Sequence, residues 1–238
     1  MCTIGGIIRD GTVLLFKNFD YPPVARGWAQ LIPSAHGHEH LALVDHDQRG
    51  VNSGLNRAGL GLVISRSEWD HPSSPESEEL RTVANAEMLT RFSTVRDAVD
   101  HLEGYVRDHP RMYGGNVILA DCGCLSVTEH LGEKHRTEIV TEGSIARANH
   151  SVFGLVNNEY ESSQRRYSQM VAFLEGIEDR MARIGTPRLI DLGKRLLRTP
   201  PILNENTRSS FVIDLSNLAV HHLTGGERWR RMTFSGEG

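Results

Sequence analysis

The chain has 238 residues, of which 39% are hydrophobic and 24% are charged, and its formal net charge at pH 7 is −4. This is the composition of an ordinary globular protein, and its mild acidity argues against a nucleic-acid-binding surface. No apolar run is long enough to span a membrane, and the first residues lack the basic start and unbroken apolar stretch of a secretory signal. We therefore expect a cytoplasmic protein with neither a nucleic-acid nor a membrane partner.

The first part of the chain predicts strands. "CTIGGIIR" and "TVLLFKNF" are β-rich runs joined by Asp10-Gly11, a strong two-residue turn, so residues 1–21 predict a hairpin. Residues 22–40 are rich in Pro, Gly and His and predict a long loop excursion. "HLALVDHD" then predicts a strand, and "GLNRAGLGLVIS" predicts a turn that leads into another strand.

The middle of the chain predicts two helices followed by strands. "SSPESEELRTVANAEMLTRF" offers a serine N-cap with Pro75 in the first turn, and "STVRDAVDHLEGYVRD" offers Thr94 as a cap. "NVILADCGCLSVTEHLG" predicts a hairpin that turns near residues 122–124, and "RTEIVTEG" and "SIARANHSV" predict two more strands.

Apolar residues at helical spacing predict a long helix over residues 159–184 and a short one near 187–198. The chain closes with three predicted strands, "SSFVIDLS", "LAVHHLTG" and "RWRRMTF". Strands at both ends with helices between them favour layered sheets covered by helices. Without a repeat or a linker, residues 1–238 are expected to form a single domain.

Cys2 stands directly behind the initiator methionine. Removal of Met1 would leave Cys2 with both a thiol and a free α-amine, whose reference pKa values are near ~8.5 and ~7.7–8.0. An N-terminal amine can act as the base for the nucleophile on its own residue. The alternative is a cysteine of no consequence, so position alone does not decide the matter. The other cysteines, Cys122 and Cys124, lie at a predicted turn, and free thiols are expected for all three.

Further stretches carry a resemblance to a known family. "MCT", "FKNFDY", "GLNRAGLGLVIS", "RANH" and "SSQRRY" occur in this order, followed by the closing pair "SSFVIDLSNLAVHHLTG". In order and spacing they resemble the cysteine-type N-terminal nucleophile hydrolases of the choloylglycine hydrolase and penicillin acyltransferase branch. The resemblance implies an α+β fold, a four-layer αββα sandwich of two antiparallel sheets flanked by helices.

The resemblance also implies roles for individual residues. Cys2 would be the nucleophile, Asp20 would accept a hydrogen bond from the N-terminal amine, and Lys17 would place a cation near the thiol. Asn56 and Asn149 would donate to the oxyanion of the tetrahedral intermediate. Arg166 would complete the site, whereas the adjacent Arg165 would face away from it.

The implied reaction is hydrolysis or acyl transfer at a non-peptide amide of a small molecule through a Cys2 acyl-enzyme, without a cofactor or a metal. Two alternatives remain open: a class II glutamine amidotransferase domain, which also begins Met-Cys, and a binding protein that has kept the fold without the activity. Lys17 stands where the family usually has arginine, Arg57 replaces an acidic residue, and the chain is shorter than the bile-salt enzymes, so bile salts are not the expected substrate. The sequence does not identify the acyl group or the acceptor. It also leaves the oligomeric state open, and a homo-oligomer is one of the possibilities.

A cluster of three histidines allows two interpretations, a metal site or ordinary loop residues. His36, His38 and His40 alternate within "SAHGHEH" and could gather a metal ion on one strand face. Such a cluster in a loop is more often solvated or lines a pocket, and we expect no metal there.

Overall fold

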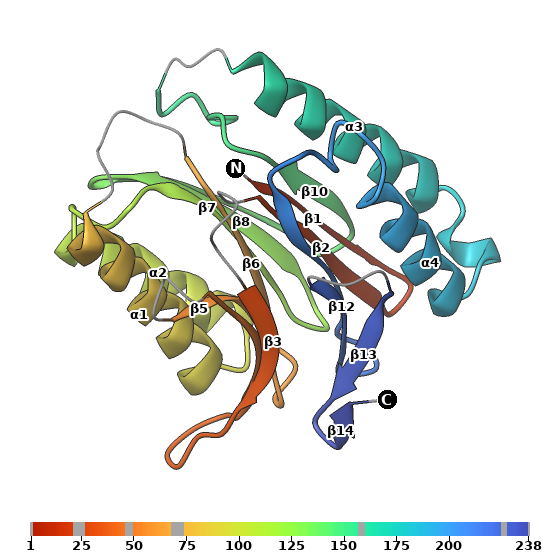
Figure 1. Ribbon diagram of the computed structural model, residues 1–238. Coiled ribbons are helices and arrows are strands. Elements are labelled where there is room, and N and C mark those ends of the chain that lie inside the picture. Colours follow the sequence, from red (N-terminus) through yellow and green to blue (C-terminus); the bar gives the residue numbers. More distant parts are fainter. Residues whose placement is uncertain are drawn as a thin grey trace.

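The computed structural model describes residues 2–20, 27–45, 50–67, 74–156, 160–224 and 228–237. Two seven-stranded sheets stack face to face, and helices cover the outer face of each (Figure 1). Every neighbouring strand pair within the sheets is antiparallel. The four-layer αββα sandwich expected from the resemblance is therefore confirmed.

The first sheet contains the N-terminal hairpin at its centre. Asp10 and Gly11 have φ values of 50° and 73°, the left-handed pair that a two-residue hairpin turn requires, and this confirms the predicted turn. The strand order is β10-β1-β2-β11-β12-β13-β14, made of β10 (Gly143–Arg147), β1 (Cys2–Arg9), β2 (Thr12–Asp20), β11 (Thr207–Asp214), β12 (Ala219–Thr224), β13 (Arg230–Thr233) and β14 (Gly236–Glu237).

The second sheet is a meander in which each strand pairs with the next one along the chain. Its members are β3 (Gly27–Ile32), β4 (His40–Asp45), β5 (Val51–Asn56), β6 (Gly61–Arg66), β7 (Gly115–Ala120), β8 (Leu125–Leu131) and β9 (Lys134–Val140). The turn between β7 and β8 contains Cys122 and Cys124, as predicted. None of the cysteines is in a disulfide.

The first two helices begin at the residues that the sequence indicates. Ser74 caps α1 (Pro75–Arg91) through a reciprocal pair of bonds with Ser77, and Thr94 caps α2 (Val95–Asp108) by accepting from the Asp97 nitrogen. On the other side of the molecule lie α3 (Glu161–Glu178), the short 3₁₀ turn Met181–Arg183 and α4 (Thr186–Leu196). Among the described residues, no helix is both long and apolar enough to cross a membrane.

Three apolar clusters separate the four layers. One lies between the sheets and includes Cys2, Ile4 and Phe19. A second packs α1 and α2 against the second sheet, and a third packs α3 and α4 against the first sheet. Because side chains alternate along a strand, β1 and β2 each serve both the central cluster and the outer one.

The structure differs from the sequence-based expectation in three places. The excursion over residues 22–40 contains a strand, β3, and residues 21–26 lie outside the described residues. Gly54 lies within β5 rather than in a turn, where a Cβ atom would come within 2.6 Å of the Leu41 carbonyl oxygen. The long helix ends at Glu178, and Met181 keeps the apolar spacing because it packs against the same cluster from the 3₁₀ turn.

Candidate active site

The register of the N-terminal hairpin decides which side chains share a face with the thiol. Cys2 lies opposite Phe19 and Ile4 opposite Lys17, and directly paired residues of an antiparallel sheet share a face. Cys2, Phe19 and Ile4 belong to the central cluster. Lys17 therefore points between the sheets together with the thiol, whereas Asp20 lies on the opposite face of β2.

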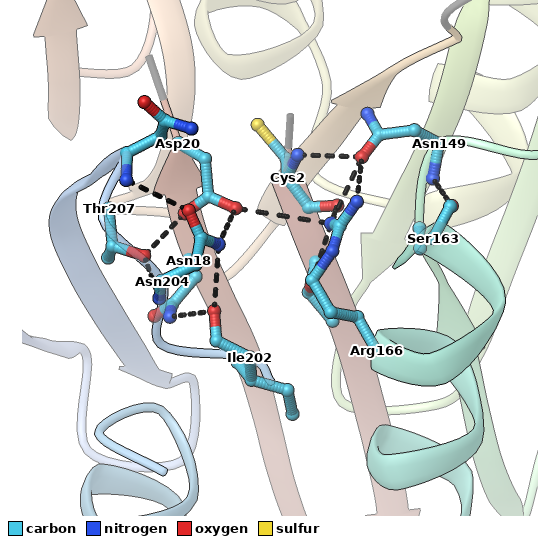
Figure 2. A network of polar contacts seen from close by, with 12 residues as sticks. Cys2, Asn18, Asp20, Asn149, Ser163, Arg166, Ile202, Asn204 and Thr207 are labelled. Carbon is cyan, nitrogen blue, oxygen red and sulfur yellow. Dashed lines mark hydrogen bonds and ion pairs between the residues drawn. The ribbon is translucent and has the colours of Figure 1, made fainter. Parts of the chain in front are cut away.

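The main-chain nitrogen of Cys2 donates to the side-chain oxygen of Asn149 over 2.9 Å (Figure 2). Two nitrogens of the Arg166 guanidinium donate to the same oxygen, each over 3.1 Å. Because a guanidinium is only a donor, the Asn149 oxygen must face it. The Asn149 amide nitrogen then points the other way and donates to the Arg66 carbonyl oxygen over 2.5 Å.

Arg166 is buried, and its guanidinium binds other groups of the protein. Its side chain is 2% exposed, and it also donates to the Cys2 carbonyl oxygen over 2.8 Å and to the Thr3 hydroxyl over 3.1 Å. The adjacent Arg165 is exposed on α3. Of the two arginines, the structure brings the expected one to Cys2 and Asn149, although its contacts are those of a residue that orients Asn149 and the start of β1.

Asp20 is fully buried beside this group on the helix-covered face of β2. It accepts from the Asn204 amide and the Thr207 hydroxyl, each over 2.7 Å, and lies 3.9 Å from an Arg166 nitrogen (Figure 2). Burial raises the pKa of this carboxyl, and the bonds from Thr207 and Asn204 oppose the rise. The Arg166 guanidinium therefore lies between Asp20 and Asn149, and Asn149 is the residue that binds the Cys2 nitrogen.

Lys17 is a fully buried cation that reaches from one sheet to the other. Its ammonium donates to the Ile64 carbonyl oxygen over 2.7 Å and to the Asn52 side-chain oxygen. It also lies 5.7 Å from the centre of the Phe19 ring, the cross-strand partner of Cys2. The structure thus brings Lys17 to the thiol-bearing face of the hairpin.

Asn56 does not join this group, which corrects the expectation that it donates to an oxyanion. It ends β5 at the turn toward β6, four residues beyond Asn52, or roughly 13 Å at the usual rise of a strand. Its oxygen accepts from the Leu60 nitrogen over 2.8 Å, and its amide nitrogen donates to the carbonyl oxygens of Leu89 and Phe92 over 2.8 and 2.7 Å. Asn56 therefore ties the β5–β6 turn to the end of α1.

This position predicts a stability effect. Asn56→Ala leaves three main-chain groups without these partners, and we expect it to lower the free energy of unfolding by at least about 2 kcal/mol. The turnover of the folded protein should be nearly unchanged. Thermal melting and turnover measured well below the melting temperature check this together. A large fall in kcat with an unchanged melting temperature would return Asn56 to the site.

Several polar residues near Cys2 were not predicted from the sequence. Asn204 and Thr207 reach Asp20 because β11 lies beside β2, which only the strand order reveals. Ser65 shows a weak sign in advance, as a polar residue that ends the apolar run "GLVIS". Such residues include Asn52, Ser65, Asn116, Ser163, Asn204 and Thr207.

The histidine cluster shows no arrangement for a metal. His40 is buried, with its ring 3.3 Å from the His38 carbonyl oxygen, and burial lowers its pKa, while His36 is exposed. In the parts of the chain that the structure describes, no three or more His, Cys, Asp or Glu side chains are grouped to hold a metal ion.

Solved structures with the same fold include three amide-processing proteins. Penicillin V acylase from Agrobacterium tumefaciens has a TM-score of 0.69 and 14% identity over 99% of this chain and 86% of that one. A conjugated bile acid hydrolase mutant from Clostridium perfringens has a TM-score of 0.65 and 13% identity over 99% and 93%. A Caenorhabditis elegans N-acylethanolamine-hydrolyzing acid amidase ortholog has a TM-score of 0.61 and 12% identity over 91% and 93%.

Sequence comparison gives a family but no near relative. Among curated proteins, none is significantly similar to the chain. A model of the acyl-coenzyme A:6-aminopenicillanic acid acyl-transferase family matches residues 8–186, which is most of the chain. Together with the sandwich fold and the group around Cys2, this match means that the chain belongs to the acyl-coenzyme A:6-aminopenicillanic acid acyl-transferase family.

Proposed function

We propose that the protein hydrolyses a non-peptide amide or transfers its acyl group, with Cys2 as the nucleophile after removal of Met1. The observation that carries the proposal is the bond from the Cys2 nitrogen to the Asn149 side-chain oxygen. It ties the nitrogen that would become the α-amine to an amide whose orientation Arg166 fixes. The family match and the acylase, hydrolase and amidase among the structural neighbours support the reaction class.

The α-amine acts as the base of the reaction. Because the Asn149 oxygen is an acceptor, it takes a hydrogen of the amine and leaves the lone pair for the thiol proton. The thiolate attacks the substrate carbonyl carbon, and the electron pair moves to the oxygen. When the carbon–nitrogen bond breaks, the proton on the amine passes to the departing nitrogen and a thioester remains.

The second half of the reaction reverses these steps. Water or a second amine loses a proton to the α-amine and attacks the thioester carbonyl. The tetrahedral intermediate then expels the Cys2 thiolate, which recovers its proton from the α-ammonium. No cofactor or metal is needed for either half, and a tetrahedral oxyanion forms in both.

Three polar side chains assist Cys2 in this scheme. Asn149 uses one N–H on the Arg66 carbonyl oxygen, and its second N–H is the proposed donor to the oxyanion. Lys17 and the Cys2 thiol lie on the same face of the hairpin. The positive charge of Lys17 there favours the thiolate. Asp20 and Arg166 form the ionic group that holds the amine and Asn149 in place, in agreement with the burial of both.

The proposal is tested by intact-mass measurement after incubation with a panel of amides. The panel holds a phenoxyacetyl amide, a bile-acid conjugate, an N-acylethanolamine and glutamine, and amine release is followed in parallel. We expect a chain without Met1 and an acyl adduct that peptide mapping assigns to Cys2. Mapping also examines Cys122 and Cys124, which should carry no adduct.

The other outcomes separate the alternative functions. Ammonia release from glutamine alone would indicate a glutamine amidotransferase. A chain that keeps Met1, forms no adduct and releases no amine from any member of the panel would indicate a binding protein with the same fold.

A further inference from the structure

The peptide group between Ala148 and Asn149 lies just beyond β10, where the ladder of the first sheet has ended. Side chains from three elements bind both of its polar ends. Its carbonyl oxygen accepts from the Ser65 hydroxyl over 2.6 Å and from the Asn116 amide over 3.2 Å. Its N–H donates to the Ser163 hydroxyl over 2.7 Å.

These three side chains are almost completely buried, with exposed fractions of 2% for Ser65 and 0% for Asn116 and Ser163. Ser65 and Asn116 come from neighbouring strands of the second sheet, and Asn116 also donates to the Ser65 hydroxyl over 3.2 Å. Ser163 comes from α3 on the other side of the molecule. A buried peptide group needs partners at both ends, and here the partners come from opposite sides of the sandwich.

Holding a peptide group at both ends fixes its rotation about the line between its two Cα atoms. That rotation sets the direction in which the Asn149 side chain leaves the main chain. We propose that Ser65, Asn116 and Ser163 are positioning residues that hold Asn149 where its amide can meet both the Cys2 nitrogen and the oxyanion. The inference rests on the proposed function, since it assigns Asn149 a part in the reaction.

Ser163 contacts a second residue besides Asn149. Its oxygen accepts from Asn149 and lies 2.8 Å from the His150 Nδ1 atom. A serine hydroxyl has one hydrogen and two acceptor lone pairs, so the tautomer of His150 decides which of the two atoms donates in this contact. Burial lowers the pKa of His150, with Arg147 and Arg166 acting in the same direction and Glu129 opposing them. His150, packed edge to face against Tyr167, is thus a second contact of the hydroxyl that binds Asn149.

A double-mutant cycle tests this inference with an amide that the wild-type protein turns over. Ser163→Ala removes the bond to the Asn149 N–H, and we expect kcat to fall between about 10- and 100-fold, because small misplacements of a reacting group have effects of that size. KM should stay within about twofold, since no substrate contact is lost. In the Asn149→Ala background, Ser163→Ala should have little further effect, because its role is then already lost.

Two further variants make the result decisive. Ser65→Ala acts at the opposite end of the same peptide group and should reproduce both the kcat loss and the non-additivity. Thr128→Val is the matched control: it removes a buried hydroxyl whose 2.9 Å contact is with Thr137, away from Asn149, and it should lower only the melting temperature.

The inference fails if the Ser163 and Ser65 variants turn over like the wild-type protein, or if their effects add fully to that of Asn149→Ala. It also fails if Thr128→Val loses as much kcat as they do, because a general loss of stability would then explain all three. Failure of the proposed function looks different, since the wild-type protein would then form no acyl adduct on Cys2.

Discussion

Replacing Cys2 by serine is expected to lower kcat/KM by at least about 10⁴-fold, the scale seen when an enzyme loses its nucleophile. The α-amine proposed as the base can take a proton from a thiol, but an aliphatic hydroxyl is a far weaker acid. Serine is only slightly smaller than cysteine, and Cys2 has an exposed fraction of 4%, so the fold should be retained. Steady-state turnover and circular dichroism measured on the same preparation check both parts.

Cys124 supplies the matched control for this substitution. It is also buried, but in the cluster beneath α1 and α2, where burial and the nearby Asp121 raise the pKa of its thiol. Cys124→Ser should therefore keep the wild-type turnover. Substantial turnover by Cys2→Ser with an unchanged spectrum would rule out Cys2 as the nucleophile.

The second large effect is expected from a change that alters no side chain. An uncleavable residue inserted between Met1 and Cys2 turns the α-amine into an amide nitrogen, which has no basic lone pair. An amide N–H can still donate to the Asn149 oxygen, so the geometry of the 2.9 Å bond can persist while the base is lost. We expect turnover to fall by about 10²- to 10⁴-fold, the usual contribution of general base catalysis.

A cleavable version of the same extension provides the control. If a protease removes the added residues so that Cys2 becomes the first residue, turnover should return to the wild-type level. Full activity in the uncleaved protein would show that another group takes the thiol proton. His150 would then be the first residue to examine, because its ring contacts the Ser163 hydroxyl that binds the Asn149 N–H.

Local patterns explain most of what the sequence predicted correctly. Asp10-Gly11 joins two β-rich runs, and Ser74 and Thr94 precede helical spacing, so the information for these elements lies within a few residues. The strand β3 was missed because its residues lie in a Pro-, Gly- and His-rich stretch whose strand character depends on pairing with β4. The end of α3 was missed because Met181 continues the apolar spacing beyond the helix.

Some residues of the site could likewise be predicted from motifs, and others depend on the fold. The family motifs led to Cys2, Lys17 and Arg166, which the structure brings to the two faces of one hairpin end. The motif did not show where Asn56 binds, because a turn asparagine can equally bind main-chain groups, and this one does so between the β5–β6 turn and the end of α1. Contacts such as those of the Ala148 carbonyl oxygen with Ser65 and Asn116 join segments far apart in sequence, so no local pattern encodes them.

Two of the bonds around the thiol run from one sheet to the other. Lys17 on β2 binds the Ile64 carbonyl oxygen on β6, and Asn149, which follows β10, binds the Arg66 carbonyl oxygen at the end of β6. A chain in which only the N-terminal hairpin has formed has neither contact. Its Cys2 would be an ordinary cysteine even after Met1 has been removed. The proposed chemistry would thus switch on only when the two sheets dock.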